Sequence, residues 1–182
     1  MALIVEYHVV ADQYPVGASA IQAGMLVQLT GGLVVPLATS ANPDQIALGI
    51  AGDSRLAAEG QTTAYSDTVV IGADGAGTRW TSNRVSDFYN EALASHKITV
   101  YNGGGKFWIS ATLFDSDGVG MTAGTLLKGS GSTAGEWVGS GTDDDVLGLA
   151  VGGVTAYGSG VPGTDVDGHI SLGNYIPVVL RV

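Results

Sequence analysis

The sequence predicts an all-β protein, a compact barrel or sandwich, and three observations support this. Glycine accounts for 29 of the 182 residues, about twice its usual share, and glycine is favoured wherever a turn needs a positive φ. The acidic residues comprise 13 Asp and 4 Glu; Asp favours turns, whereas Glu favours helices. A segment with the pattern of short strands and glycine-rich turns also occurs twice in the chain.

The repeated segment runs from Ala23 to Gly52 and again from Ala123 to Gly152. With one residue deleted from the second copy, the sequence Leu48-Gly49-Ile50-Ala51 matches Leu147-Gly148-Leu149-Ala150. The matched positions are small, apolar or glycine, which are the residues that packing and turns require, while the polar residues between them differ. We therefore expect a duplicated structural module and not a duplicated active site.

The repeat suggests a simple domain organisation. We expect an extended N-terminal arm at residues 1–20, followed by a single all-β domain at 21–182 that contains related modules at about 21–56 and 121–156. Whether the two modules form one barrel or two is left open by the sequence.

Three further elements follow from local patterns. The segment 86–95, SDFYNEALAS, predicts one short helix, because Ser86 is a favourable N-cap and Asp87 places negative charge in the first turn. The segments 97–101 and 106–109 are rich in aromatic and β-branched residues and flank an Asn-Gly turn, which predicts a β-hairpin. Residues 170–182 predict two closing strands.

Charge and composition exclude several classes of function. The formal net charge is −10 with only seven Lys and Arg residues, and nucleic-acid binding requires basic residues that displace counterions from phosphates. We therefore expect no nucleic-acid partner and no membrane partner. The absence of cysteine excludes disulfides, thiolate metal sites and cysteine nucleophiles. No apolar run approaches the roughly 18–20 residues of a membrane span, and the N-terminus does not resemble a signal peptide.

The short motifs in the chain are better explained as turns than as chemical sites. The sequence from Gly158 to Gly163 has the letters of a dinucleotide-binding loop, but no helix follows it. Asp115-Ser-Asp117-Gly118 and Asp165-Val-Asp167-Gly168 begin like calcium loops but lack the distal Glu of that motif. The three histidines are scattered. We expect no enzymatic activity, no catalytic residue, no cofactor and no metal, with structural calcium as the minor alternative.

Two groups of residues are candidate interface residues. The extended segment 2–10 places Ile4, Glu6 and His8 on one face and Val5, Tyr7 and Val9 on the other. An extended apolar terminus can add as a strand to the open sheet edge of a neighbouring chain. The predicted interface residues are Ile4, Val5, Tyr7 and Val9, together with Trp80, which precedes the predicted helix, and Tyr89, which lies in it.

Three stretches carry a resemblance to a known family. They are AIQAGMLVQLTGGLVVPLATSANPDQIALGIAGD, NRVSDFYNEALASHKITVYNGGGKFWIS and GVPGTDVDGHISLGNYIPVVLRV. Together they resemble the decoration (cement) proteins of tailed-bacteriophage capsids. The resemblance implies a structural virion protein that binds the outer surface of the assembled capsid and stabilises it. The implied partner is the major capsid protein, the implied state is a homo-oligomer (dimer or trimer), and assembly would take place in the bacterial cytoplasm.

Three alternatives remain at this point. The chain could be another structural component of the phage head or tail. It could be a carbohydrate- or host-surface-binding β module on the virion, for which Trp80 or Trp137 would supply an aromatic platform. It could also be a secreted, calcium-stabilised β enzyme or adhesin.

Overall fold

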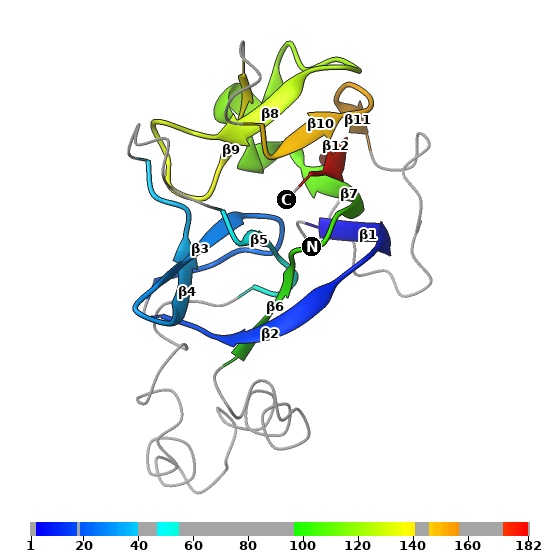
Figure 1. Ribbon diagram of the computed structural model, residues 1–182. Helices are drawn as coiled ribbons and strands as arrows, with labels where there is room; N and C mark the ends of the chain where they lie inside the picture. The colour runs from blue at the N-terminus through cyan, green and yellow to red at the C-terminus, as the bar shows by residue number, and fades with distance from the viewer. Residues whose placement is uncertain are drawn as a thin grey trace, which may run out of the picture.

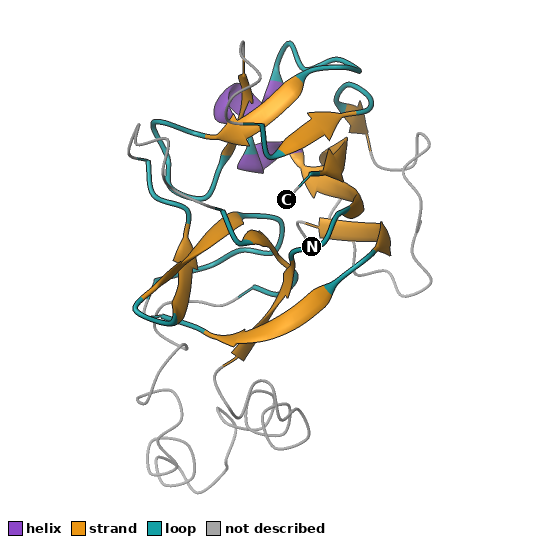
Figure 2. Ribbon diagram, viewed as in Figure 1, coloured by secondary structure: helices purple, strands orange, loops and turns teal. Residues whose placement is uncertain are grey.

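A computed structural model describes residues 3–17, 19–39, 47–54, 97–140, 146–156 and 173–181. Within these ranges the chain forms antiparallel strands in two sheets and, apart from them, only two short 3-10 turns, η1 (Ala111–Leu113) and η2 (Asp115–Gly118) (Figure 2). The predicted all-β class is confirmed. The helix predicted at 86–95 lies outside the described residues.

The first sheet, here called unit 1, contains five strands in the order β2-β6-β5-β3-β4. Their bounds are β2 (Ala11–Pro15), β3 (Leu26–Thr30), β4 (Leu33–Pro36), β5 (Gly49–Ala51) and β6 (Lys97–Tyr101). A parallel bridge between Val16, which follows β2, and Val34 of β4 brings the two edges of this sheet together. Unit 1 is therefore a small, nearly closed barrel, which lies in the lower half of Figure 1.

The second sheet contains unit 2, with the strand order β7-β12-β10-β8-β9. The bounds are β7 (Gly105–Ser110), β8 (Leu126–Gly129), β9 (Trp137–Ser140), β10 (Gly148–Ala150), β11 (Thr155–Ala156) and β12 (Asn174–Leu180). A parallel bridge between Phe114 and Trp137 closes this unit in the same way. Strand β11 pairs with β12, and the N-terminal strand β1 (Leu3–His8) pairs with β7.

The two units have the same chain path. In each, the first strand pairs with the last, the last with the fourth, the fourth with the second and the second with the third. The register is also the same, because Leu26 pairs with Ile50 in unit 1 and Leu126 pairs with Leu149 in unit 2. The equivalence therefore extends from the repeated segment to entire units, although β2 and β7 share no recognisable sequence.

The turn that opens each repeat has the same geometry. Gly24 has φ +95° and Gly124 has φ +94°, a region that residues with a side chain rarely adopt. The amide of Gly24 donates to the carbonyl of Ala51 at 2.8 Å, and the amide of Gly124 donates to that of Ala150 at 2.8 Å. The glycines shared by the two copies thus hold the same turn in both units.

Equivalent residues also fill the two interiors. The interior of unit 1 is a separate cluster that includes Val27, Val34, Ala51, Ile98 and Val100. Their counterparts belong to the larger second cluster and are also buried: Leu127, Trp137, Ala150, Ile176 and Val178. Burial of apolar side chains of this size, at about 1.5–3 kcal/mol each, is the main favourable term for each barrel.

The larger cluster also joins the units, because it includes residues from the outer face of unit 1. Leu26 and Ile50 are fully buried between the units. The turn before β9 lies against them: Leu26 donates its amide to the carbonyl of Gly135 at 2.8 Å, and Gly135 donates to the carbonyl of Leu37 at 2.8 Å. The indole Nε1 of Trp137 donates to the carbonyl of Gly24 at 3.0 Å.

The predicted hairpin at 97–109 is wrong in its pairing. Both segments are strands, but β6 pairs with β2 and β5, whereas β7 pairs with β1 and β12. Residues 102–104 therefore connect one barrel to the other. Gly104 and Gly105 have φ +85° and +138°, which allows the chain to turn sharply out of one sheet and into the next.

The predicted arm is extended, but its strands are paired within the same chain. Strand β1 forms the edge of the sheet that contains unit 2, and β2 is the first strand of unit 1. The N-terminal segment thus contacts both units, and β1, as the edge strand, pairs with β7 on one side only among the described strands.

A substitution at Gly49 tests the close approach of β5 to β6. A Cβ at this position would overlap the carbonyl oxygen of Tyr101, so Gly49→Ala is expected to lower the free energy of unfolding by about 2–3 kcal/mol. The matched control is Gly31→Ala, which also introduces a side chain at positive φ but meets no atom within 4 Å. The control should cost only about 1 kcal/mol of backbone strain. Urea denaturation measures both, and equal losses would contradict this packing.

Candidate functional site

The structure separates the four described interface candidates into two pairs. Ile4 is partly buried against Trp108 and Tyr175, and Val5 is partly buried against the main core. Tyr7 and Val9 are 53% and 68% exposed. Only the second pair is available for contact with a partner. The other two candidates, Trp80 and Tyr89, lie outside the described residues.

A bulge in β1 explains this separation. Val5 pairs with Phe107, but Tyr7 pairs with the adjacent Lys106, so that Glu6 is an extra residue in the strand. A β-bulge interrupts the alternation of side chains between the two faces of a sheet. The alternation predicted from the sequence therefore does not continue beyond Val5.

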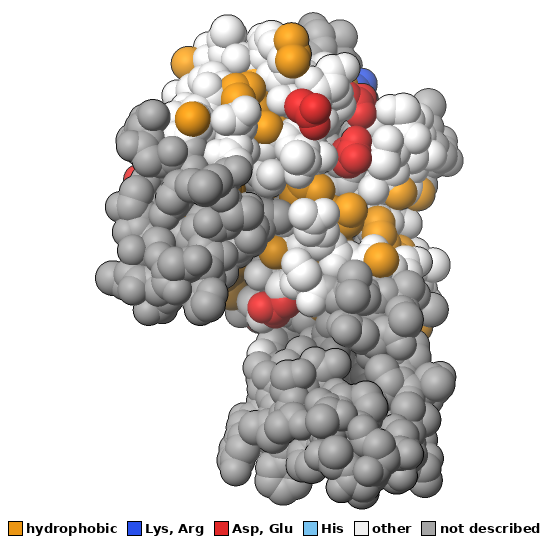
Figure 3. All heavy atoms as spheres, turned by 180° about the vertical axis from the view of Figure 1, so that it is seen from behind, with side chains coloured by type: hydrophobic (Ala, Val, Ile, Leu, Met, Phe, Trp, Pro, Cys, Tyr) orange, Lys and Arg blue, Asp and Glu red, His pale blue; other side chains and the backbone are white. Residues whose placement is uncertain are grey.

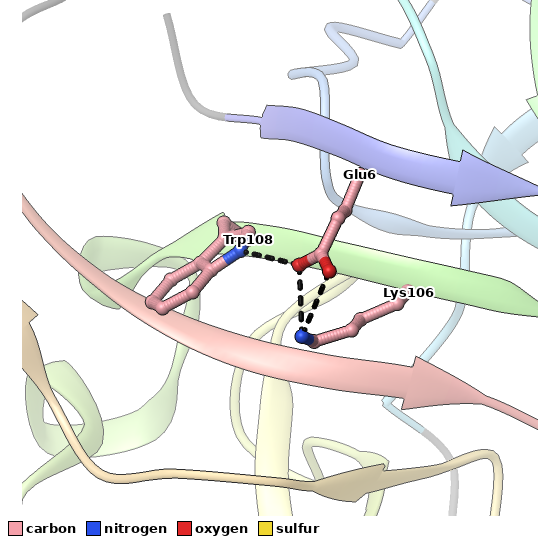
Figure 4. Close-up of polar contacts among 3 residues, drawn as sticks. All are labelled: Glu6, Lys106 and Trp108. Carbon is pink, nitrogen blue, oxygen red and sulfur yellow. Dashed lines mark hydrogen bonds and ion pairs between the residues drawn. The ribbon is translucent and has the colours of Figure 1, made fainter. Parts of the chain in front are cut away.

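The extra residue places its carboxylate over β7. Glu6 accepts a hydrogen bond from the indole Nε1 of Trp108 at 3.1 Å and from Lys106 Nζ at 3.0 Å, and its second ion-pair distance to Lys106 is 2.9 Å (Figure 4). Lys106 and Trp108 are two residues apart in β7, so their side chains share one face of the strand. This Glu6 contact fixes β1 on β7.

The electrostatics of the Glu6 contact favour the ionised carboxylate. The hydrogen bond from Lys106, and after it the bond from Trp108, lower the pKa of Glu6 from its usual value, against a smaller opposing effect of burial. The side chains of Lys106 and Glu6 are 28% and 33% exposed, so water screens part of the attraction. The contact therefore contributes orientation together with modest stability.

The exposed residues Tyr7, Val9 and Val10 form a group at the connection between β1 and β2, here called the β1–β2 patch. The backbone of this connection is fixed, because Val9 donates its amide to the carbonyl of Gly104 at 3.2 Å and Asn102 donates to that of Val10 at 3.2 Å. The patch is thus an apolar surface held in one position at the junction of the two units. Exposed apolar groups of this kind are typical of contacts with partner proteins.

The acidic groups near η2 form no described metal site. The carboxylate of Asp115 accepts hydrogen bonds from the hydroxyls of Ser130 and Ser132, and Asp115-Ser-Asp117-Gly118 is a tight turn. Burial, and then the charge of Asp115, raise the pKa of Glu136. Among the described residues, no group of three or more His, Asp or Glu side chains could hold a metal ion. The motifs at 143–145 and 165–168 lie outside those ranges.

Trp137 offers no platform for a sugar ring. Its side chain is fully buried, its ring stacks on that of Phe114 with a centroid distance of 6.2 Å, and its indole nitrogen is bonded to Gly24. Trp108 is also buried and is bonded to Glu6. As an exposed aromatic platform for a sugar ring, the aromatic residues on the surface of β1 are therefore better candidates than Trp108 or Trp137.

The variant Glu6→Gln tests the Glu6 contact. The amide oxygen can still accept from Trp108, but the ion pair with Lys106 is lost, so the free energy of unfolding at pH 7 should fall by about 1 kcal/mol or less. Because the pKa of folded Glu6 is lowered, its stabilisation is complete above the ordinary value of 4.5 and is lost as the pH falls through the folded pKa.

The difference in stability between the wild type and Glu6→Gln should consequently shrink as the pH falls below 4.5 and disappear once the pH is below the folded pKa of Glu6, where both side chains are uncharged. Urea denaturation over a series of pH values from 7 downward provides the measurement. Glu6→Gln in a Lys106→Met background is the control and should have a smaller effect at pH 7. A difference that persists unchanged in acid would contradict the assigned role of the ion pair.

Comparison with protein-family models and with curated proteins finds no match for this chain. Within the part of the chain that the structure describes, no helix is long and apolar enough to cross a membrane.

Proposed function

We propose that the chain is a structural virion protein that binds the outer surface of an assembled tailed-phage capsid and stabilises the shell. The observation that carries this proposal is the construction from two equivalent barrels, in which the residues shared by the repeats serve turns and packing. Such a chain supplies a rigid body with surfaces for contact, and the β1–β2 patch is the apolar surface that we assign to the capsid.

The charge distribution supports an outer location. A protein with a net charge of −10 is repelled by packaged DNA but not by the outside of a protein shell. Seen from behind, hydrophobic side chains reach the surface in small groups, and acidic side chains lie among them on the upper part of the molecule and again lower down (Figure 3). Small apolar contacts with the capsid would therefore lie beside solvated acidic side chains.

Stabilisation of the shell would follow from mass action. A ligand that binds the assembled lattice but not its free subunits stabilises the lattice by RT ln(1 + [L]/Kd) for each site, where [L] is the free ligand concentration. The Glu6 contact and the backbone bonds of Val9 and Val10 hold the β1–β2 patch in place before binding. A preorganised surface loses less conformational freedom on association, so each copy could bind with a small contact area.

The alternatives receive different support. The carbohydrate- or host-surface-binding module loses one of its two aromatic platforms, because Trp137 is buried, and Trp80 lies outside the described residues. Another structural role in the phage head or tail would use the same rigid units and differs only in the partner.

Co-sedimentation with empty capsid shells from the phage that encodes the chain tests the proposal. We expect the wild type to sediment with expanded shells and the double variant Tyr7→Ser, Val9→Ser to bind about tenfold more weakly or worse. Because both side chains are exposed, the thermal midpoint of the free protein should change little. The control is Val119→Ser, which removes an 81% exposed side chain of unit 2.

The experiment distinguishes a failure of the proposed function from a failure of the assigned contact surface. A wild-type protein that does not bind shells, and is missing from the virion, would overturn the proposed function. A double variant that binds as well as the wild type would overturn only the assignment of the β1–β2 patch.

A further inference from the structure

Equivalent faces of the two units differ in their burial. On unit 1, the residues of this face are all buried: Ala23, Gly24, Leu26, Ala47 and Ile50. Their counterparts on unit 2 retain exposure to solvent: Ala123 and Gly124 are exposed, and Leu126, Val146 and Leu149 are partly exposed. We call the second set the 123–149 face. It is apolar, and the same backbone geometry presents it.

The difference arises because unit 2 covers the face of unit 1. The turn between β8 and β9 contributes Gly135, which exchanges hydrogen bonds with Leu26 and Leu37, and Trp137, which donates to Gly24. The hairpin of one unit therefore lies on the face of the other. The hairpin of another unit 1 is the equivalent element that could cover the 123–149 face.

The matching hairpin of unit 1 is exposed. Gly32 has φ +84° and corresponds to Gly135, which has φ +79°. A Cβ at Gly135 would lie 3.3 Å from the carbonyl oxygen of Leu26, whereas a Cβ at Gly32 would meet no atom within 4 Å. Leu29 and Leu33 on either side of this turn are 45% and 42% exposed. We call residues 29–33 the free hairpin.

We propose that the free hairpin of one copy packs on the 123–149 face of a second copy, so that the chains associate head to tail. The contact uses the hairpin and the face that are equivalent by position to those that join the two units within one chain. It leaves each copy with one hairpin donated and one face covered. A contact of this heterologous kind closes into a ring or extends as a filament; in a ring, the number of barrels is twice the number of chains.

The chemistry of the two surfaces suits self-association of an acidic protein. The segment LVQLTGGLVVP at 26–36 contains no charged residue, and neither do MTAGTL at 121–126 and VLGLAVG at 146–152. Three acidic residues, Asp143 to Asp145, directly precede Val146 in the sequence, and burial of Leu29 and Leu33 against Leu126 and Leu149 provides the attraction.

The contact between chains differs from the internal one in four respects. Val34 replaces Trp137, so the bond to the glycine carbonyl is missing. Leu29 replaces Gly129, where a Cβ would lie 2.6 Å from Leu37, so the two surfaces cannot approach as closely. The free hairpin turns through Gly31 and Gly32, whereas the hairpin of unit 2 has the longer turn 131–135. Leu126 pairs with Ser140 in its own hairpin, whereas Leu26 accepts a bond from Leu37 and donates its amide to Gly135. The contact between chains therefore depends on apolar side chains and should be the weaker of the two.

Light scattering on the purified 18.4-kDa chain tests the proposal with two complementary variants. The hairpin variant is Leu29→Ser with Leu33→Ser, and the face variant is Ala123→Glu. The wild type should be an oligomer, and each variant should have a dissociation constant raised about tenfold or more. All substituted side chains are exposed in the single chain, so each variant should remain folded, which far-UV circular dichroism and urea denaturation verify.

A mixture of the two variants gives the decisive readout. The hairpin variant keeps an intact face and the face variant keeps an intact hairpin, so together they should form a 1:1 complex that cannot extend further. A wild-type monomer, variants that assemble normally, or monomeric variants that form no complex when mixed would each overturn the proposal. The control Tyr7→Ser, Val9→Ser should retain the wild-type oligomer, which separates self-association from capsid binding.

Discussion

The docking of the 135–137 turn of unit 2 on unit 1 is the contact on which the rest of the structure depends. Trp137 fills the interior of its own barrel and bonds the backbone of the other through Gly24. Without this contact, Leu26 and Ile50 would be an exposed apolar surface that costs free energy in water. One turn thus completes the core of one barrel, covers the face of the second and fixes their relative position.

The part of the fold that could be predicted from the sequence is the part that the repeat encodes. Glycines at turns and apolar residues in the strands recur because both copies need the same φ values and the same interior, as at Gly24 and Gly124. The equivalence of β2 with β7 could not be predicted from the sequence. The two strands occupy the same position in their barrels through backbone pairing, but their side chains are unrelated. The predicted hairpin at 97–109 failed because an Asn-Gly-Gly-Gly segment also permits a crossing between two sheets.

The candidate site was predictable only in part. The apolar N-terminal strand was visible in the sequence, but the bulge at Glu6 depends on its tertiary partners Lys106 and Trp108. For the same reason the sequence could not show that Trp137 is buried or that Ile4 packs against Trp108 and Tyr175. The surface available to a partner therefore follows from β1 lying on β7. The apolar character of β1 alone does not define this surface. The uncovered face of unit 2 is recognised only when the two barrels are compared.

We propose that a chain of two equivalent barrels covers the outside of a phage capsid. The most direct test is a cryo-electron-microscopy reconstruction of shells incubated with the protein, at a resolution that resolves strands. The account predicts two barrels per bound chain on the outer surface of the shell, with the β1–β2 patch against the capsid. Shells that carry no barrel density on their outer surface at saturating protein would contradict it.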